Sequence, residues 1–174
     1  MARNFFMSTK RCGFSKWEAG DIKLAELLWG DAEVTRYICS SGSFSMEDIA
    51  TRLQKEVDNN AQYRVQYWPV FALDSDELIG CCGLRPRGEG TFELGFHLRP
   101  KFWRQGYAVE AARAVIDYAF SALNADGLFA GHNPKNTASA KVLGKLGFDY
   151  IGDEFYEPTG LYHPSYELKK REKE

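Results

Sequence analysis

The sequence predicts a single α/β domain in which a mixed β-sheet of about six to seven strands is flanked by about four helices. Three strand-like stretches follow one another between residues 67 and 98, and short turn sequences separate them. A glycine-containing loop then leads into a long helix over residues 107–123. A second strand–loop–helix unit follows over residues 127–147, so strands and helices alternate in the second half of the chain.

Length and composition fit one globular domain spanning residues 1–174, with a charged tail at 169–174. The hydrophobic fraction is 44% and the aromatic fraction 14%, which are values typical of folded proteins. A formal net charge of −2 argues against a nucleic-acid binder that depends on phosphate contacts. No signal peptide is evident, and no apolar run approaches the roughly 20 residues that a membrane helix needs. We therefore expect a soluble, cytoplasmic protein without nucleic-acid or membrane partners.

The four cysteines predict buried, reduced thiols and no metal site. Cys12, Cys39, Cys81 and Cys82 have none of the spacings typical of metal ligands. Cys81 and Cys82 are neighbours on a predicted strand, so their side chains should point to opposite faces of the sheet and cannot easily bridge.

The first third of the chain reads as one strand and three helices. The strand is expected at 9–14, followed by a helix at 21–29 and a short helix at 31–37. Ser45 lies three residues before an acidic residue, which is a helix-start signature, and the paired residues Asn59-Asn60 are expected to end that helix.

The predicted strands of the sheet are separated by turn sequences rich in Gly, Pro and Asp. Turns are expected at 74–77 and 85–90, and a third at 158–160. The strands are expected at 67–73, 78–84, 91–98, 127–132, 148–155 and 161–168.

The loop before the long helix has the features of an anion site. Arg104, Gln105 and Gly106 precede the helix, whose apolar face recurs at three- and four-residue steps. Unpaired backbone N–H groups and the helix dipole favour an anion at such a position, most often a phosphate. The alternative is that the glycine is present only for steric reasons.

A second motif supports the anion site. Residues 133–139 read Asn-Pro-Lys-Asn-Thr-Ala-Ser, and Leu146-Gly147-Phe148 closes the following helix. Together with the Arg-Gln-Gly-Tyr-Ala loop, this pattern resembles the GNAT superfamily of acetyl-CoA-dependent N-acetyltransferases. It is most similar to the RimJ/RimL-like branch, which acetylates the N-termini of ribosomal proteins. The resemblance is strongest over residues 78–166.

The resemblance implies a partly splayed sheet, acetyl-CoA as acetyl donor, no metal, and an amine acceptor that attacks the thioester directly. The leading acceptor is a protein or peptide N-terminal α-amine. Two alternatives stay open: a small-molecule amine such as a polyamine, amino acid or antibiotic, and a non-catalytic acyl-CoA sensor. The sequence leaves open whether the protein is a monomer or a homodimer.

The resemblance also assigns the residues that would bind the donor. Trp103 stands where the family usually has Gln or Arg, so we expect it to lie beside the loop without bonding phosphate. The backbone amides of the loop would hold the pyrophosphate, the preceding strand would pair with the pantetheine arm, and two asparagines would bind its amides. The loop residues that would hold the pyrophosphate are Arg104, Gln105, Gly106, Tyr107 and Ala108. The strand residues that would pair with the pantetheine arm are Phe96, His97 and Leu98, and the two asparagines are Asn133 and Asn136.

Three side chains are candidates for the catalytic steps. Ser139 would donate a proton to the departing thiolate, or alternatively would only bind the cofactor. Glu93 is the preferred base for the acceptor ammonium and Glu157 the second choice, with Glu154 behind both. A carboxylate of ordinary pKa is a weak base toward an ammonium group, so the base would act through water or have a raised pKa. A role for His97 is left open.

Overall fold

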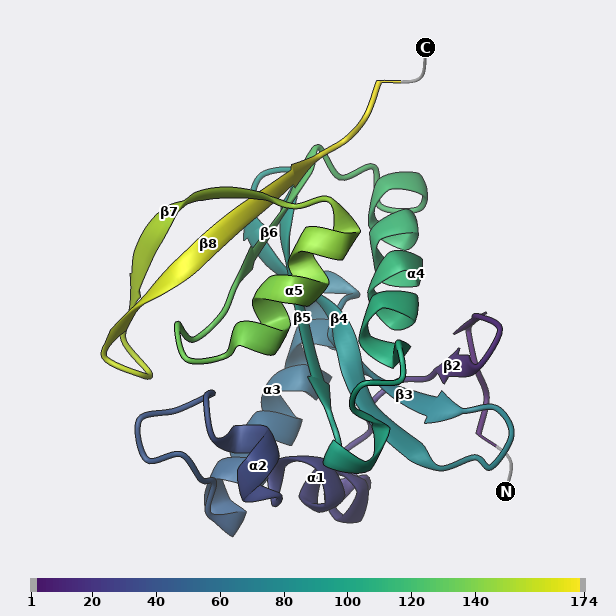
Figure 1. Cartoon of the computed structure of the whole chain (residues 1–174). Coiled ribbons are helices and arrows are strands. Elements are labelled where there is room, and N and C mark those ends of the chain that lie inside the picture. Colours follow the sequence, from purple (N-terminus) through teal and green to yellow (C-terminus); the bar gives the residue numbers. More distant parts are fainter. Residues whose placement is uncertain (1–2, 173–174) are drawn as a thin grey trace.

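The computed structural model describes residues 3–172 and confirms the predicted α/β fold class, with one strand and one helix more than expected (Figure 1). A single eight-stranded sheet has the order β1-β2-β3-β4-β5-β6-β8-β7, with five α-helices and one 3₁₀ helix around it. In chain order the elements are β1 (Met7–Ser8), β2 (Cys12–Phe14), α1 (Ile22–Trp29), α2 (Ala32–Thr35), α3 (Met46–Tyr63), β3 (Tyr67–Ala72), β4 (Leu78–Gly88), β5 (Thr91–Leu98), η1 (Pro100–Phe102), α4 (Tyr107–Ser121), β6 (Gly127–Gly131), α5 (Thr137–Leu146), β7 (Asp149–Tyr156) and β8 (Leu161–Lys169).

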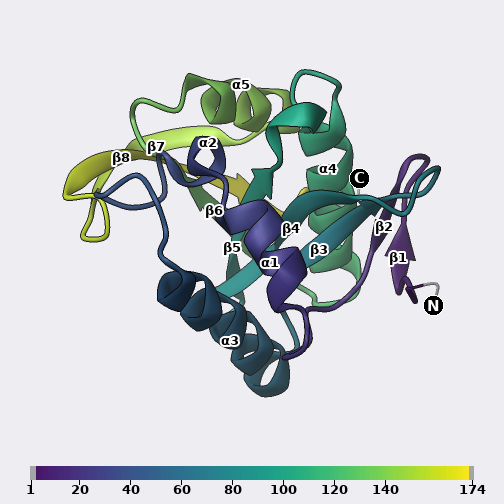
Figure 2. The ribbon, with the colours of Figure 1, turned by 90° about the horizontal axis from the view of Figure 1, so that it is seen from below.

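Two hydrophobic cores cover the two faces of the sheet. One core joins the sheet to α4 and α5 through residues such as Ala112 and Leu143. The other joins it to α1 and α3 through residues such as Leu28 and Leu53, and Figure 2 shows α1 lying across β3 and β4 with α3 beside it. Cys81 belongs to the α1/α3 core and Cys82 to the α4/α5 core, which confirms the predicted opposite orientations.

The strand expected at 9–14 is wrong in detail, because this stretch contains a tight turn between two short strands. The Thr9 amide donates to the Cys12 carbonyl at 2.8 Å, and the Cys12 amide donates to the Thr9 hydroxyl at 3.1 Å. A threonine hydroxyl that accepts from the backbone stabilises such a turn locally. Among the cysteines, Cys39 differs from the expectation, since it is only half-buried.

Helix α3 begins as predicted but continues past the expected end. Ser45 and Asp48 form a reciprocal capping box at its start. The helix runs through Asn59 and Asn60 to Tyr63 because their low helix propensity costs only a fraction of a kcal/mol per residue, less than the burial of its apolar face stabilises.

Replacing Ser45 by Ala is expected to lower the free energy of unfolding by about 1 kcal/mol, because the Asp48 amide loses its acceptor. Ser43→Ala is the matched control, since the Ser43 side chain is exposed and is not part of the capping box. Urea denaturation of both variants checks this; equal stabilities would show that the cap contributes nothing.

Strand β4 is longer than predicted, and this extension places Arg85 opposite Glu93, a candidate catalytic residue. The stretch 85–88 was expected to be a turn but belongs to the strand, and the chain reverses at Glu89-Gly90. A register shift between Pro86 and Gly88 accommodates the proline, which cannot donate to a regular ladder. As a result Arg85 lies directly opposite Glu93 on β5.

The centre of the sheet is splayed. The neighbouring strands β5 and β6 are parallel and pair at only three positions, of which Glu93↔Phe129 is the last. Beyond this pair β6 continues with β8, while β5 continues with β4. We call the unpaired edge of β5 from Leu94 to Leu98, together with the facing end of β6, the splay.

Candidate active site

The splay presents unpaired backbone groups of β5. The Arg99 amide donates to the Ile79 carbonyl of β4, so in an extended strand the backbone groups of His97 also point toward β4. Those of Phe96 and Leu98 therefore point the opposite way, into the splay. The Trp103 indole N–H donates to the Leu98 carbonyl at 2.8 Å, as expected for a residue that lies beside the loop. The Leu98 amide and both backbone groups of Phe96 are left to bind an extended ligand.

The loop that follows β5 has the backbone geometry of an anion cradle. Gly106 is the N-cap of α4 and has a φ of +81°, a conformation that favours glycine. A Cβ atom at this position would meet only the Arg11 guanidinium, at 3.4 Å, so the space over the loop is open. Amides at the start of α4 lie at the positive end of the helix dipole, which suits a pyrophosphate.

Arg11, in the turn between β1 and β2, holds this loop in place. Its Nε donates to Glu110 Oε2 at 2.7 Å and its Nη1 donates to the Gln105 carbonyl at 3.0 Å. The guanidinium also lies over the Tyr107 ring, 4.0 Å from its centroid. Sequence reasoning missed this clamp because Arg11 and Glu110 are 99 residues apart and no local motif connects them.

The second motif lies on the β6 side of the splay. The Asn133 side chain is buried, accepts from the Lys135 amide at 3.0 Å and donates to the Tyr37 carbonyl at 3.4 Å. Asn136 is the N-cap of α5 and accepts from the Ser139 amide at 3.2 Å. The Ser139 side chain is half-buried, and its hydroxyl makes no hydrogen bond within residues 3–172. Its hydroxyl is therefore available to a ligand.

Glu93 lies at the vertex of the splay with its side chain on the α1/α3 face. Its neighbour Leu94 is buried in the α4/α5 core, so strand alternation directs the Glu93 carboxylate the other way. Burial raises the pKa of Glu93, although the guanidinium groups of Arg85 and Arg87 oppose this rise. A raised pKa makes this carboxylate a stronger base than an ordinary surface glutamate.

The other two candidate carboxylates are exposed. Glu154 forms an ion pair with Arg87 at 2.7 Å. Glu157 lies in the turn between β7 and β8, and this turn contacts the loop after α2 through a hydrogen bond from the Ser40 amide to the Pro158 carbonyl at 2.9 Å. The structure therefore brings Glu93 to the splay and leaves Glu157 at the tip of the β7–β8 hairpin.

His97 has structural partners on the α1/α3 face. Its Nδ1 lies 3.2 Å from the Trp29 indole nitrogen, which can only donate, and 3.6 Å from Cys81 Sγ. Burial lowers the pKa of His97 well below its ordinary value, so the imidazole is neutral at pH 7 and accepts through Nδ1. This geometry gives His97 a role in orienting Trp29.

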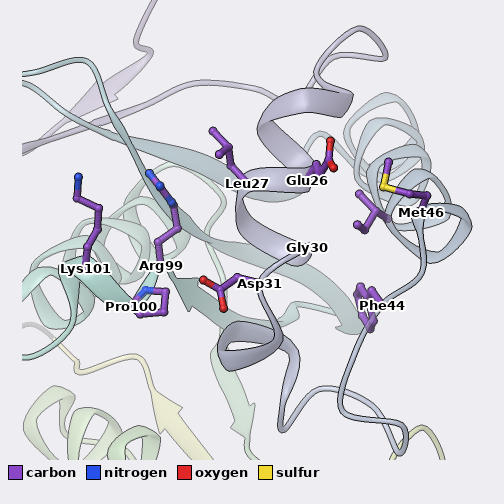
Figure 3. Close-up of a pocket in the computed structure, with 10 residues that line it drawn as sticks. Glu26, Leu27, Gly30, Asp31, Phe44, Met46, Arg99, Pro100 and Lys101 are labelled. Atoms are coloured by element: carbon purple, nitrogen blue, oxygen red, sulfur yellow. The ribbon is translucent and has the colours of Figure 1, made fainter.

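Two cavities flank the splay, and neither is lined by Glu93. The larger, about 650 Å³, lies between α1, the start of α3 and the segment that follows β5 (Figure 3). The smaller, about 330 Å³, is lined by Tyr37, Asn133 and Thr159, among others. Two aromatic residues, Tyr37 and Phe44, line these cavities, whereas Trp29 is fully buried in the core.

The part of the chain that the structure describes contains no group of three or more side chains arranged to hold a metal ion. Within the same residues, no helix has the combination of length and apolar character that crossing a bilayer requires.

The sequence is similar to those of known acetyltransferases. Residues 11–149 match the family described as acetyltransferase (GNAT) domain. The uncharacterized N-acetyltransferase p20 of Bacillus licheniformis is 30% identical over 146 residues, which cover 83% of this chain and 82% of the relative. FsC-acetyl coenzyme A-N(2)-transacetylase of Aspergillus fumigatus is 39% identical over 70% of this chain and 55% of its own length. The alanine N-acetyltransferase of ribosomal protein uS5 from Escherichia coli is 29% identical over 49% of this chain and 46% of its own.

Solved structures have the same fold. A GNAT-family acetyltransferase from Bacillus anthracis superposes with a TM-score of 0.80 at 26% identity, covering 95% of this chain and 98% of that one. RimL, a ribosomal L7/L12 α-N-protein acetyltransferase solved in complex with coenzyme A, superposes with a TM-score of 0.80 over 95% of this chain and 98% of its own, at 12% identity. The family match, the p20 relative and the splayed sheet with its Gly106 loop lead to one conclusion: the chain belongs to the GNAT family and is an acetyl-CoA-dependent acetyltransferase.

Proposed function

We propose that the chain acetylates the α-amine of a protein or peptide N-terminus, as the RimJ/RimL-like branch does. The observation that carries the proposal is the geometry of the splay, with the Gly106 loop at one end and the partly desolvated Glu93 at the other. The names of the uS5 alanine N-acetyltransferase and of RimL, an α-N-protein acetyltransferase, specify ribosomal proteins as acceptors, which supports a protein acceptor.

The proposal assigns a residue to each step of the transfer. Acetyl-CoA supplies a thioester, which the Gly106 loop, Phe96 and Asn133 would hold across the splay. The Leu98 amide would bind the carbonyl oxygen as negative charge develops on it. The attacking amine forms the N–C bond while the C–S bond breaks. Glu93 takes the ammonium proton through water and Ser139 donates a proton to the thiolate, and the second proton that the nitrogen loses as the amide forms returns to Ser139.

Acetylation of a small-molecule amine is the second candidate. The specific observation in its favour is the 39% identity to FsC-acetyl coenzyme A-N(2)-transacetylase, the name of which specifies transfer to an N2 amine. A panel containing short peptides with free N-termini, the same peptides N-acetylated, and free amines separates the two. Preference for the free N-terminal peptides in kcat/KM supports the first candidate, whereas preference for the small amines supports the second.

Gly106→Ala is expected to weaken acetyl-CoA binding by roughly tenfold or more, because the added methyl group would occupy the space proposed for the phosphates. Gly147→Ala is the matched control. Gly147 has a φ of +85°, close to that of Gly106, and a Cβ atom there would also point into open space. It lies at the C-terminal end of α5, away from the loop. Both variants should lose similar thermal stability, since both place alanine in the left-handed region. Isothermal calorimetry with CoA checks the affinity; equal affinities in the two variants would make Gly106 a purely structural glycine.

A further inference from the structure

A buried ion cluster lies on the α1/α3 face of the sheet, beside the vertex of the splay. Glu56 of α3 is fully buried, and its carboxylate accepts from Arg85 Nη2 at 2.9 Å and from the Tyr67 amide at 2.7 Å. Arg52, one turn earlier on α3, places its Nε 3.3 Å from the same carboxylate, without the alignment of a hydrogen bond. Both guanidinium groups lie over the Tyr67 ring, Arg85 at 4.2 Å and Arg52 at 5.4 Å from its centroid.

The two guanidinium groups have more donors than the described residues satisfy. Nε and Nη2 of Arg52 and Nε of Arg85 are buried without a hydrogen-bond partner within residues 3–172. The Nη1 atoms also make no hydrogen bond in that range and are not among the buried atoms, so they can reach a ligand. Buried polar groups are nearly always paired, and an unpaired set of cationic donors therefore points to an anion or ordered water that binds there.

The cluster lies at the vertex of the splay, beside the proposed base. Arg85 is the direct cross-strand neighbour of Glu93, the last residue of β5 that pairs with β6. The end of the Tyr67 ring lies over Gly95, where a Cβ atom would come within 2.3 Å of Tyr67 Cζ. Since Gly95 separates Glu93 from His97 on the same face of β5, the Tyr67 ring lies between these two side chains.

The charges around this position do not balance. Arg52, Arg85 and Lys55 contribute three positive charges, while Glu56 and Glu93 contribute two negative charges. The Arg87–Glu154 pair beside them is neutral as a unit. The charge of Arg85, burial and the charge of Arg52 together lower the pKa of the Lys55 ammonium, as expected where positive charge is in excess.

We propose that Arg52 and Arg85, aligned on the Tyr67 ring, form a subsite for a carboxylate that the acceptor carries on the same residue as its reacting amine. This inference rests on the proposed function and narrows it to free amino acids or peptides whose first residue is acidic. The Nη1 groups of the two arginines offer one charged donor to each oxygen of a carboxylate. The same excess of positive charge would repel a polyamine. The subsite lies on the face opposite α4, so it does not compete for the phosphates of the donor.

The test compares acceptors that differ only in this charge: a peptide beginning with Asp against the same peptide beginning with Asn, and alanine against alaninamide. Rates are expressed per concentration of neutral amine, because the two members of each pair differ in amine pKa. We expect the carboxylate member of at least one pair to have the higher kcat/KM by roughly tenfold or more. The peptide pair and the amino-acid pair distinguish the two sources of the carboxylate.

Arg52→Met is the informative variant, since it keeps an apolar side chain against Trp29 and Tyr67 and leaves Arg85 to pair with Glu56. It should reduce the acid-to-amide ratio by about fivefold or more, as expected for loss of one charged hydrogen bond. Arg113→Met, on the exposed face of α4, is the matched control and should keep the wild-type ratio.

Calorimetry with the N-acetylated Asp-first and Asn-first peptides in the presence of CoA measures the same preference without turnover. If no amine is acetylated, the proposed function fails. The ratio of the affinities for the Asp-first and Asn-first peptides still shows whether the carboxylate subsite exists. Equal turnover and equal binding of the acid and amide members would overturn the inference. It is also overturned if Arg52→Met lowers the melting temperature but leaves the ratio unchanged, since the cluster would then be only structural.

Discussion

Replacing Glu93 by Gln is expected to lower kcat by roughly 10²–10³-fold at pH 7, and the defect should shrink as the pH rises. The reason is the position of the carboxylate at the vertex of the splay and its raised pKa. An acceptor ammonium must lose its proton before attack, and a base with a raised pKa removes it more effectively. At alkaline pH the amine is already neutral, so the base is needed less.

The pH profile separates this role from a structural one. In the wild type, kcat/KM should rise with pH until Glu93 has lost its proton and the amine is neutral. Because burial raises the pKa of Glu93, the lower limb of this profile should lie above the range of an ordinary glutamate. Glu154→Gln is the matched control, since this carboxylate is exposed on the β7–β8 hairpin, and Glu157→Gln tests the second candidate base. A wild-type rate and profile in both Glu93→Gln and Glu157→Gln would show that water or the substrate carries the proton away.

Ser139→Ala should lower kcat by roughly 10²-fold or more while changing the acetyl-CoA KM much less, because a proton donor to the leaving sulfur acts mainly in the transition state. The Ser139 hydroxyl makes no hydrogen bond within residues 3–172, so its loss should not disturb the N-cap of α5, which uses the Ser139 backbone amide. Thr137→Ala, two residues earlier in the same helix, is a control for helix stability. An unchanged kcat with a raised KM would assign Ser139 to cofactor binding.

Several features of the fold and of the candidate site were predictable because a short stretch of sequence determines each of them. The start of α3 follows from the capping box at Ser45, and the start of α5 from the N-cap at Asn136. Gly106 marks a left-handed residue before α4, and the direction of Glu93 follows from strand alternation once Leu94 is assigned to the core. Each of these features depends on residues within a few positions of one another.

The parts that the sequence did not predict depend on contacts between distant segments. The Arg11–Glu110 clamp joins the β1–β2 turn to α4, and nothing local marks either residue. Arg85 was assigned to a turn because a Pro-Gly-rich stretch usually interrupts a strand, yet a register shift keeps it in β4 opposite Glu93. The pairing of Arg52, Glu56 and Arg85 across α3 and β4 became visible only with the tertiary structure.

The measurement that tests the central claim most directly is the release of free thiol from acetyl-CoA, with and without an amine acceptor, together with the mass of the acceptor. We predict release that depends on the amine, one acetyl group gained per thiol released, and a rate that Glu93→Gln and Ser139→Ala reduce without abolishing CoA binding. Binding of CoA with no amine-dependent release, across peptides, amino acids and small amines, would contradict the account and leave a protein that binds acyl-CoA without transferring its acyl group.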